Sequence, residues 1–429
     1  VPATPFETSG ACLGVEEIRN LLERPEIKYL SEMMNFPGVL FNDPEVMAKL
    51  ALARHNGKPV DGHAPGVRGA DAEKYIGAGI TTDHECFTIE EAKEKISHGM
   101  SILIREGSAA KNFDALIPLI KDFPNRIMLC SDDKHPDDLL RGHINILVKR
   151  ALSLGYDFMS VIRCCTLNPV KHYSLDAGLL QPGDPADFIV IDSPEDFNVQ
   201  KTFINGELVA ESGMSLLSSL SIENINAFDA RPIVPTDLEI MATGDEMLVM
   251  KALEGQLITE KLRITPTVRN GLAVSDPERD LIKIVVLNRY QPSAPAVGFI
   301  TNTGLKRGAL ASSVAHDSHN IVAIGADDEA LSEAINMIIA TQGGISLCSD
   351  ERKEVLPLPV AGIMTGEDGF TAAGKYEHID ALAKELGFTL SAPYMTLSFM
   401  ALLVIPELKL SDKGLFDGLS FSFTSLFPQ

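Results

Sequence analysis

The chain has 429 residues, of which 45% are hydrophobic, and its mean hydropathy is +0.09. This length and composition predict a globular protein of two or three domains with a large buried core. Its 59 acidic residues outnumber its 37 lysines and arginines, which gives a net charge of -22. Such a field repels phosphate backbones and anionic lipid, so we expect neither nucleic acid nor a membrane as a partner.

The six cysteines are too few for a disulfide framework, and no CxxC pair occurs among them. We therefore expect reduced thiols and a cytoplasmic protein. The longest apolar stretch, MTLSFMALLVIPEL, contains Thr, Ser and Pro and is too short to span a bilayer. The chain opens on VPATPFE without an initiator Met, and we expect that its parent protein is longer.

Short β-rich runs alternate with amphipathic helices in the first part of the chain. The predicted pairs are EIKYLSEMM with DPEVMAKLALARHNG, KPVDGHAPG with GADAEKYIGAG, ITTDHE with TIEEAKEKISHG, SILIREGS with NFDALIPLIKDF, and RIMLCSDD with HPDDLLRGHINILVKRALSLG. Consecutive βα units predict a parallel sheet in an α/β fold. We predict that this sheet closes as a TIM-like (β/α) barrel, partial at the N-terminus, because the chemically functional residues all follow strands.

The third of these helices has the pattern of a capping box, Thr88 with Glu91, and a stop signal at Gly99. After the helical stretch DFMSVIRCCTLNPVKHYSL, the period changes from that of helices to that of strands. There KTFINGELVAE predicts a hairpin with an Asn205-Gly206 turn.

The remaining sequence predicts strands in LEIMATGDEMLVM and IKIVVLNRY and a helix in ADDEALSEAINMIIATQGG. We therefore predict three parts. They are a (β/α) barrel over residues 1–183, a small β-sandwich segment over 184–222, and a C-terminal α+β domain over 223–429.

Four ionisable residues follow four predicted strands: Glu32 in YLSEMMNFPG, His63 in DGHAPG, His84 in TDHE and Asp132 in CSDD. Because the carboxyl ends of barrel strands meet at one rim, we expect these side chains to converge. Two imidazoles and two carboxylates fit a divalent-metal site that keeps positions open for water. A bound cation lowers the pKa of water to about 7, and a nearby carboxylate accepts and returns the proton, which is the chemistry of metal-dependent hydrolysis.

Several polar residues have a structural interpretation beside the functional one. Asp137 and Asp138 are expected to compensate the dipole of a helix N-terminus. His135 fits a pocket residue and an N-terminal cap equally well. For His316 and His319 in AHDSHN, a second metal site is one interpretation, and a structural turn or a pocket wall from the C-terminal domain is the favoured one.

The motifs together resemble the amidohydrolase superfamily and, within it, the adenine deaminase family. The resemblance rests on Glu32, DGHAPG, TDHE, CSDDKHPDDL and TLNPVKHYSLDAGLLQPGDPADFIVID, and in the C-terminal part on SSVAHDSHNIVAIG, TQGG, LPLPVAGIMT and MTLSFMALLVIPELKLSDKGLFD. It implies hydrolytic deamination of adenine to hypoxanthine and ammonia in purine salvage. It also implies two divalent metal ions, Mn2+ or Fe2+ with Zn2+ compatible, a small purine substrate and a homo-oligomer.

The resemblance also implies roles for single residues. Glu32 bridges the two metal ions, His63 and His84 bind the second ion, and Asp132 contacts the first ion and shuttles the proton. Glu85 protonates a ring nitrogen of the purine or, alternatively, is a solvated acid at the strand end. The remaining candidates, which either line the purine pocket or have an ordinary loop role, are Arg105, Glu106 and Ser108.

One feature departs from the family pattern. Superfamily members carry a His-x-His pair at the end of their first strand, and no such pair occurs in this sequence. We expect either that a longer parent protein supplies it or that this chain alone is an inactive fragment. Two further alternatives are another amidohydrolase, acting on a cyclic amide or a different amino-heterocycle, and a non-catalytic remnant that serves assembly or ligand binding.

Overall fold

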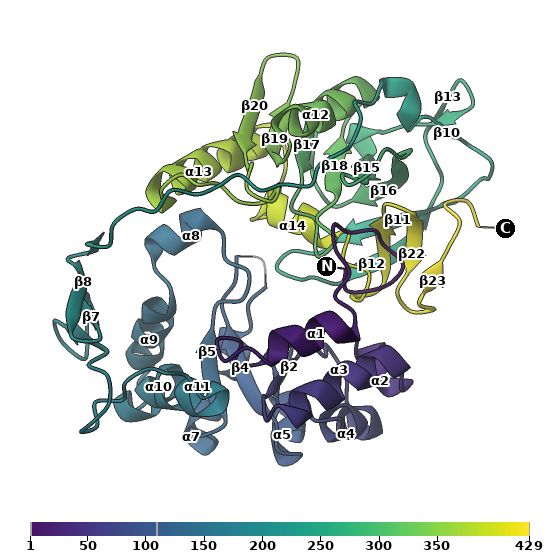
Figure 1. Cartoon of the computed structure of the whole chain (residues 1–429). Coiled ribbons are helices and arrows are strands. Elements are labelled where there is room, and N and C mark those ends of the chain that lie inside the picture. The colour runs from purple at the N-terminus through teal and green to yellow at the C-terminus, as the bar shows by residue number, and fades with distance from the viewer. Residues whose placement is uncertain (1, 109, 429) are drawn as a thin grey trace.

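The computed structural model describes residues 2–108 and 110–428. Figure 1 shows two lobes, which comprise residues 15–173 and 235–428. A small sheet over residues 188–215 stands at the edge of the first lobe, and an extended segment leads from it to the second lobe. None of the helices in the described part of the chain is long and apolar enough to cross a membrane.

The first lobe contains parallel strands in two sheets, which confirms the predicted βα units. One sheet pairs β1 (Leu30–Met33) with β2 (Val60–Gly62), and the other joins β3 (Thr82–Asp83), β4 (Ser101–Arg105) and β5 (Ile127–Cys130) in that order. β2 packs beside β3, so the two sheets continue one another. Within the described residues these strands do not close into a complete barrel.

One helix precedes the first strand of this lobe, and the other helices follow the strands along the chain. They are α1 (Val15–Leu22), α2 (Phe36–Leu40), α3 (Pro44–His55), α4 (Gly69–Gly77), α5 (Ile89–Ser97), α6 (Phe113–Leu116), α7 (Leu119–Asp122), α8 (Pro136–Arg141), α9 (Ile144–Ser153), α10 (Phe158–Cys165) and α11 (Leu167–Tyr173).

Three helices that were predicted as continuous are each divided in two. α8 and α9 are separate because Gly142 adopts a φ of 139°, which interrupts the helix. α6 and α7 meet at Pro118, which lacks the amide that a continuous helix needs. α10 and α11 are separated before Pro169, whose ring is incompatible with a helical hydrogen bond to Cys165.

The predicted capping box of α5 is only half formed. Thr88 Oγ1 accepts a hydrogen bond from the Glu91 amide at 3.2 Å, as expected. The Glu91 carboxylate does not return to the cap but accepts from Gly66 N at 3.1 Å and from Lys95 Nζ at 2.8 Å. Glu91 therefore ties α5 to the loop after β2. The helix ends as predicted, because Gly99 takes a φ of 96°.

The small sheet contains β6 (Phe188–Ile191), β7 (Val199–Ile204), β8 (Glu207–Glu211) and β9 (Met214–Ser215), all antiparallel. Asn205 and Gly206 have φ values of 51° and 81°, so the predicted hairpin turn between β7 and β8 is confirmed. A second layer that would make this sheet a sandwich is not formed by the described residues.

The second lobe is organised around an eight-stranded mixed sheet in the order β12-β11-β16-β15-β18-β17-β19-β20. Its strands and helices are β10 (Ile240–Met241), β11 (Met247–Ala252), β12 (Thr259–Ile264), β13 (Val268–Arg269), β14 (Leu272–Ala273), β15 (Ile282–Leu287), β16 (Ala296–Thr301), β17 (Ala309–Ser312), β18 (Ile321–Gly325), α12 (Asp328–Thr341), β19 (Gly344–Cys348), β20 (Lys353–Pro357), α13 (Gly369–Glu385), α14 (Pro393–Phe399), β21 (Leu408–Ser411), β22 (Gly414–Asp417) and β23 (Ser422–Phe423), with 3-10 turns η1 (Pro235–Leu238) and η2 (Pro277–Arg279).

The central strands of this sheet are buried on both faces. Successive side chains of β15 point to opposite faces, so Ile284 packs in the cluster that contains α13 and α14 residues, whereas Val285 packs against α12. Helices on both faces explain why β18 is apolar throughout and why β15 and β19 are mostly apolar. The lobes meet where α13 packs against α8 (Figure 1).

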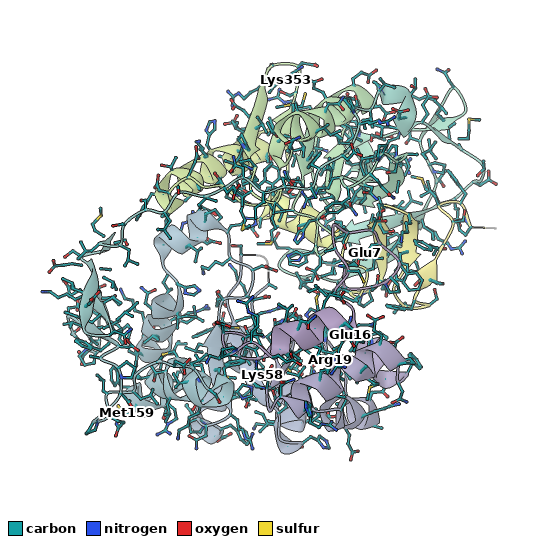
Figure 2. All side chains as sticks on the ribbon, in the orientation of Figure 1. Glu7, Glu16, Arg19, Lys58, Met159 and Lys353 are labelled. Carbon is teal, nitrogen blue, oxygen red and sulfur yellow. The ribbon has the colours of Figure 1, made fainter. Side chains whose placement is uncertain are left out.

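The residues before α1 pack on the second lobe. Thr8 N donates to Asp412 Oδ1 at 2.9 Å, and Asn320 Nδ2 donates to the Thr8 carbonyl at 2.8 Å. Glu7 is 4% exposed, and Figure 2 shows it within that lobe. Burial raises the pKa of its carboxyl to about 8. The N-terminal segment is therefore a second connection between the lobes.

Lys409 of β21 is a buried lysine that has no carboxylate partner within the described residues. Its Nζ donates to the carbonyls of Leu257 and Phe399, at 2.7 Å and 2.9 Å. Burial lowers the pKa of this ammonium to about 7, because the low-dielectric interior disfavours the charged form.

We predict a pH-dependent effect of Lys409→Met. The unfolded chain keeps an ordinary lysine pKa, so between about pH 7 and 10 it binds more protons than the folded chain, and wild-type stability rises with pH in this window. Below about pH 6 the lysine is charged in both states, and its contribution is constant. Chemical unfolding of both proteins across pH 5 to about 10 measures this, and a pH-independent difference in their free energies of unfolding would contradict it.

Candidate metal centre and active site

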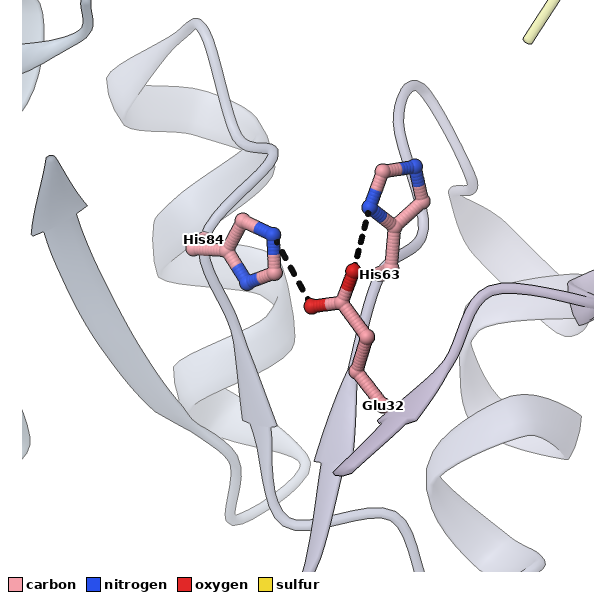
Figure 3. Close-up of side chains that lie close together, drawn as sticks. All are labelled: Glu32, His63 and His84. Atoms are coloured by element: carbon pink, nitrogen blue, oxygen red, sulfur yellow. Dashed lines mark ion pairs between the residues drawn. The ribbon is translucent and has the colours of Figure 1, made fainter. Parts of the chain in front are cut away.

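The predicted metal ligands are brought together at the carboxyl ends of neighbouring strands. Glu32 lies on β1, and His63 and His84 directly follow β2 and β3 (Figure 3). Glu32 Oε1 lies 3.5 Å from His63 Nδ1, and Glu32 Oε2 lies 3.2 Å from His84 Nε2. Asp132, after β5, lines the same pocket of about 510 Å³.

At this pocket, two sets of three side chains each bring one ligand atom close to the others. They are Glu32 with His63 and His84, and His84 with Glu85 and Asp132. Within each set the ligand atoms lie within 4.8 Å of one another. The sets share His84, so the pocket offers adjoining positions for cations.

The surroundings of His63 indicate whether this set of side chains fits a divalent ion. Its side chain is buried, yet neither ring nitrogen has a hydrogen-bond partner among the described residues. Burial alone would lower the pKa of His63, but the carboxylates of Glu85 and Glu32 raise it to about 9. The site therefore favours a positive charge at this imidazole, and a divalent ion bound to one of its ring nitrogens would supply that charge. The donor set fits a divalent metal ion.

A buried guanidinium holds the two carboxylates that were assigned to proton transfer. Arg105 is 0% exposed; its Nη1 lies 2.5 Å from Glu85 Oε1 and its Nη2 lies 2.7 Å from Glu85 Oε2. The same Nη1 lies 2.5 Å from Asp132 Oδ2. Burial raises the pKa of Asp132, although Arg105 opposes this effect. Glu85 and Asp132 are thus fixed relative to each other by one cation.

Comparison with known proteins decides the family. The chain matches the adenine deaminase C-terminal domain over residues 256–422 and the amidohydrolase family over residues 13–209. It is 53% identical over 429 residues to an adenine deaminase of Salinibacter ruber, covering 100% of this chain and 78% of that protein. Identity to an adenine deaminase of Methanosarcina mazei is 50% over 440 residues, covering 100% of this chain and 79% of that protein.

The chain belongs to the adenine deaminase family. Among solved structures, a beta-aspartyl dipeptidase of Fervidobacterium islandicum AW-1 is 14% identical with a TM-score of 0.37, covering 48% of this chain and 63% of that chain. That similarity is too low to support any conclusion about the fold of this adenine deaminase family member.

Asp83 and Lys95 form a buried ion pair behind the candidate metal ligands of this adenine deaminase family member. Lys95 is 1% exposed, and its Nζ lies 2.7 Å from Asp83 Oδ2 and 2.8 Å from the Ala64 carbonyl. Asp83 Oδ1 accepts from the amides of Ala64 and Glu85, at 3.1 Å and 3.2 Å. Burial would raise the pKa of Asp83, but Lys95 holds it below its usual range. Asp83 thereby fixes the loops that carry His63 and Glu85.

The three residues predicted to line the purine pocket are engaged within the protein. Arg105 binds carboxylates, Glu106 lies 3.3 Å from Arg150 Nη1, and Ser108 Oγ donates to Asp138 Oδ2 at 2.6 Å. Ser108 also accepts from the His135 amide at 2.9 Å. None of the three is among the described residues that line the pocket. These contacts favour the loop role for Glu106 and Ser108.

The second lobe contributes pocket residues that sequence reasoning did not assign to the active site. Leu257, Phe399 and Leu402 line the pocket, together with His316 and Asp317. The AHDSHN motif was the one sequence signal for these pocket residues. His316 lies in the pocket wall, as one interpretation of that motif expected. Within the described residues His316 and His319 are not part of a three-ligand metal cluster. His135 packs its ring against Tyr376 of α13, at 4.4 Å between ring centroids.

We predict that His63→Ala and His84→Ala each lower the metal content by about one ion per chain, because each removes a ligand of the cluster with Glu32. His55→Ala is the matched control, since His55 is exposed at the end of α3. Elemental analysis after extensive dialysis measures the bound ions. Unchanged metal content in both site variants would support a non-catalytic remnant.

We predict that Lys95→Met weakens metal affinity about 10-fold to 100-fold, because Asp83 loses the cation that fixes the ligand loops. Thermal unfolding should also occur at lower temperature, since a buried carboxylate is left unpaired. Lys93→Met on the same helix is the control, because its side chain is 48% exposed. Competition with a chromophoric chelator measures the affinity. A loss of stability with unchanged metal affinity would contradict the positioning role.

Proposed function

We propose that this protein catalyses the hydrolytic deamination of adenine to hypoxanthine and ammonia, as a step of purine salvage. The observation that carries this proposal is the convergence of Glu32, His63, His84 and Asp132 on one pocket in a chain that is similar to adenine deaminases over its whole length. A concave site with clustered ionisable groups is the expected place for such chemistry.

We propose two divalent ions at this site, with Mn2+ or Fe2+ suited to mixed imidazole and carboxylate ligands and Zn2+ compatible. Glu32 would bridge the ions, His63 and His84 would hold one of them, and Asp132 would contact the other. A divalent ion lowers the pKa of water to about 7 and so makes a nucleophile available at neutral pH.

Two carboxyl groups move the protons in the proposed reaction. Asp132 accepts a proton from the attacking water while the water oxygen forms a bond to C6 of adenine. Glu85 donates a proton to N1, so that the ring does not accumulate negative charge. Asp132 then gives its proton to the amino group, the C6–N bond breaks and ammonia leaves. The new hydroxyl returns a proton to Glu85 as the C6 carbonyl of hypoxanthine forms.

Arg105 has a positioning role in this scheme. It contacts both Glu85 and Asp132 without lining the pocket, so it holds the two carboxyl groups on the same side of the substrate. Asp132 itself has a φ of 55°, a left-handed conformation that aspartate and asparagine tolerate better than most residues. The backbone turns there to direct its side chain toward the site.

We also propose that the parallel strands of the first lobe belong to a (β/α) barrel of amidohydrolase type, with domain boundaries near residues 183 and 222. The parallel pairing of β1 with β2 and of β3 to β5 supports the barrel. The sheet of β6 to β9, between the two matched ranges, supports a separate small β domain.

We predict that the full-length protein, stripped of metal and reconstituted with Mn2+, releases ammonia and hypoxanthine from adenine in equal amounts. Chromatography of the purines together with an enzymatic ammonia assay measures this. Asp132→Asn, purified in parallel, controls for contaminating deaminases and should be at least about 100-fold slower. No ammonia from adenine would refute the substrate assignment, and turnover of a cyclic amide instead would favour the other amidohydrolase.

A further inference from the structure

An ion pair across the two lobes forms one wall of the pocket. Asp133, beside Asp132 after β5, has its Oδ2 atom 3.0 Å from His316 Nε2, in the loop between β17 and β18. The other ring nitrogen, His316 Nδ1, lies 2.7 Å from Asp317 Oδ1. The imidazole also stacks on Phe399, with ring centroids 4.6 Å apart and ring planes at 4°. His316 is therefore held at both nitrogens and on one ring face.

The backbone of this loop is fixed to α14 as well. The His316 amide donates to the Ser398 carbonyl at 3.2 Å, and Ser398 Oγ donates to the carbonyl of Val314. Burial would lower the pKa of His316, but pairing with Asp133 and Asp317 raises it to about 10. The ion pair and the backbone contacts together fix the Asp133 carboxyl group at the pocket wall.

Asp133 keeps one carboxylate oxygen available to the pocket. His316 contacts Oδ2, and within the described residues Oδ1 makes no hydrogen bond to the protein, while the side chain remains 40% exposed. An ionised carboxylate is only an acceptor, so a ligand at this wall must present a donor. Asp132 does not compete for this role, because it is paired with Arg105.

Adenine has two kinds of donor, the C6 amine and the imidazole N–H. The proposed reaction places the amine at the metal ligands, so the imidazole N–H is the donor left for another wall of the pocket. A nucleoside or a 9-alkyl purine lacks this N–H and carries a substituent in its place. A carboxylate there discriminates against such purines, because its free oxygen loses the N–H donor and meets the substituent instead.

We propose that Asp133, positioned by His316 of the second lobe, accepts a hydrogen bond from the imidazole N–H of adenine and makes the site selective for the free base over N9-substituted purines. This inference rests on the proposed function. It gives the second lobe a direct part in substrate selection, through one ion pair and the aromatic ring that supports it.

The test compares Asp133→Asn, His316→Ala and His316→Gln with wild type in the full-length, metal-loaded protein. We expect the KM for adenine to rise about 10-fold to 100-fold in Asp133→Asn and His316→Ala, with kcat within about 3-fold of wild type. His316→Gln, which retains one donor to Asp133, should restore part of the loss. His319→Asn is the control, because His319 is a neighbour in the same loop that does not line the pocket.

Inhibition by hypoxanthine and by 9-methylhypoxanthine provides the decisive readout. The preference for hypoxanthine should fall in Asp133→Asn by the same factor as adenine binding, whereas a merely structural defect weakens both inhibitors equally. Thermal unfolding and metal content verify that each variant is folded and loaded. An unchanged preference, or a loss in kcat with unchanged KM, would overturn the proposal.

Direct calorimetric binding of the two inhibitors separates this proposal from the proposed function. If the wild-type protein does not turn over adenine, the proposed deamination is refuted. A preference for hypoxanthine over 9-methylhypoxanthine that depends on Asp133 would still support the proposed contact to the imidazole N–H. Wild-type protein that deaminates adenine but binds the two inhibitors equally well would refute only the proposed role of Asp133.

Discussion

Two buried cations allow acidic side chains to gather in the first lobe. Arg105 and Lys95 are 0% and 1% exposed, and each contacts two carboxylates at the ends or behind the ends of the strands. A carboxylate removed from water without a partner is destabilised by several kcal/mol, and three or four together also repel one another. Because the two cations offset part of this negative charge, these acids can lie next to Glu32 and the two histidines.

Part of this arrangement could be predicted from the sequence because it depends on local periodicity and on one rule of topology. Glu32 lies near the end of a strand, His63 and His84 each follow one, and parallel strands place their carboxyl ends on the same side. The hairpin at Asn205 and the end of α5 were predictable for a similar reason, since both need a backbone conformation that few residues favour.

Other features could not be predicted because distant contacts decide them. Glu91 had the spacing of a capping box, but its carboxylate is used by Lys95 and the loop after β2. Arg105 follows a strand like a pocket residue, yet it points into the protein because Glu85 and Asp132 require a counter-charge. The pairing of His316 with the first lobe depends on how the lobes pack, and a single sequence does not encode that geometry in any local pattern.

The division of the pocket between the lobes separates two tasks. The candidate metal ligands belong to the first lobe, whereas Phe399, His316 and two leucines reach the pocket from the second. Replacements in the second lobe can therefore reshape the wall without disturbing the coordinating atoms. Within this family, substitutions in the second lobe alone would change which heterocycle fits the pocket, while the coordinating side chains of the first lobe stay the same.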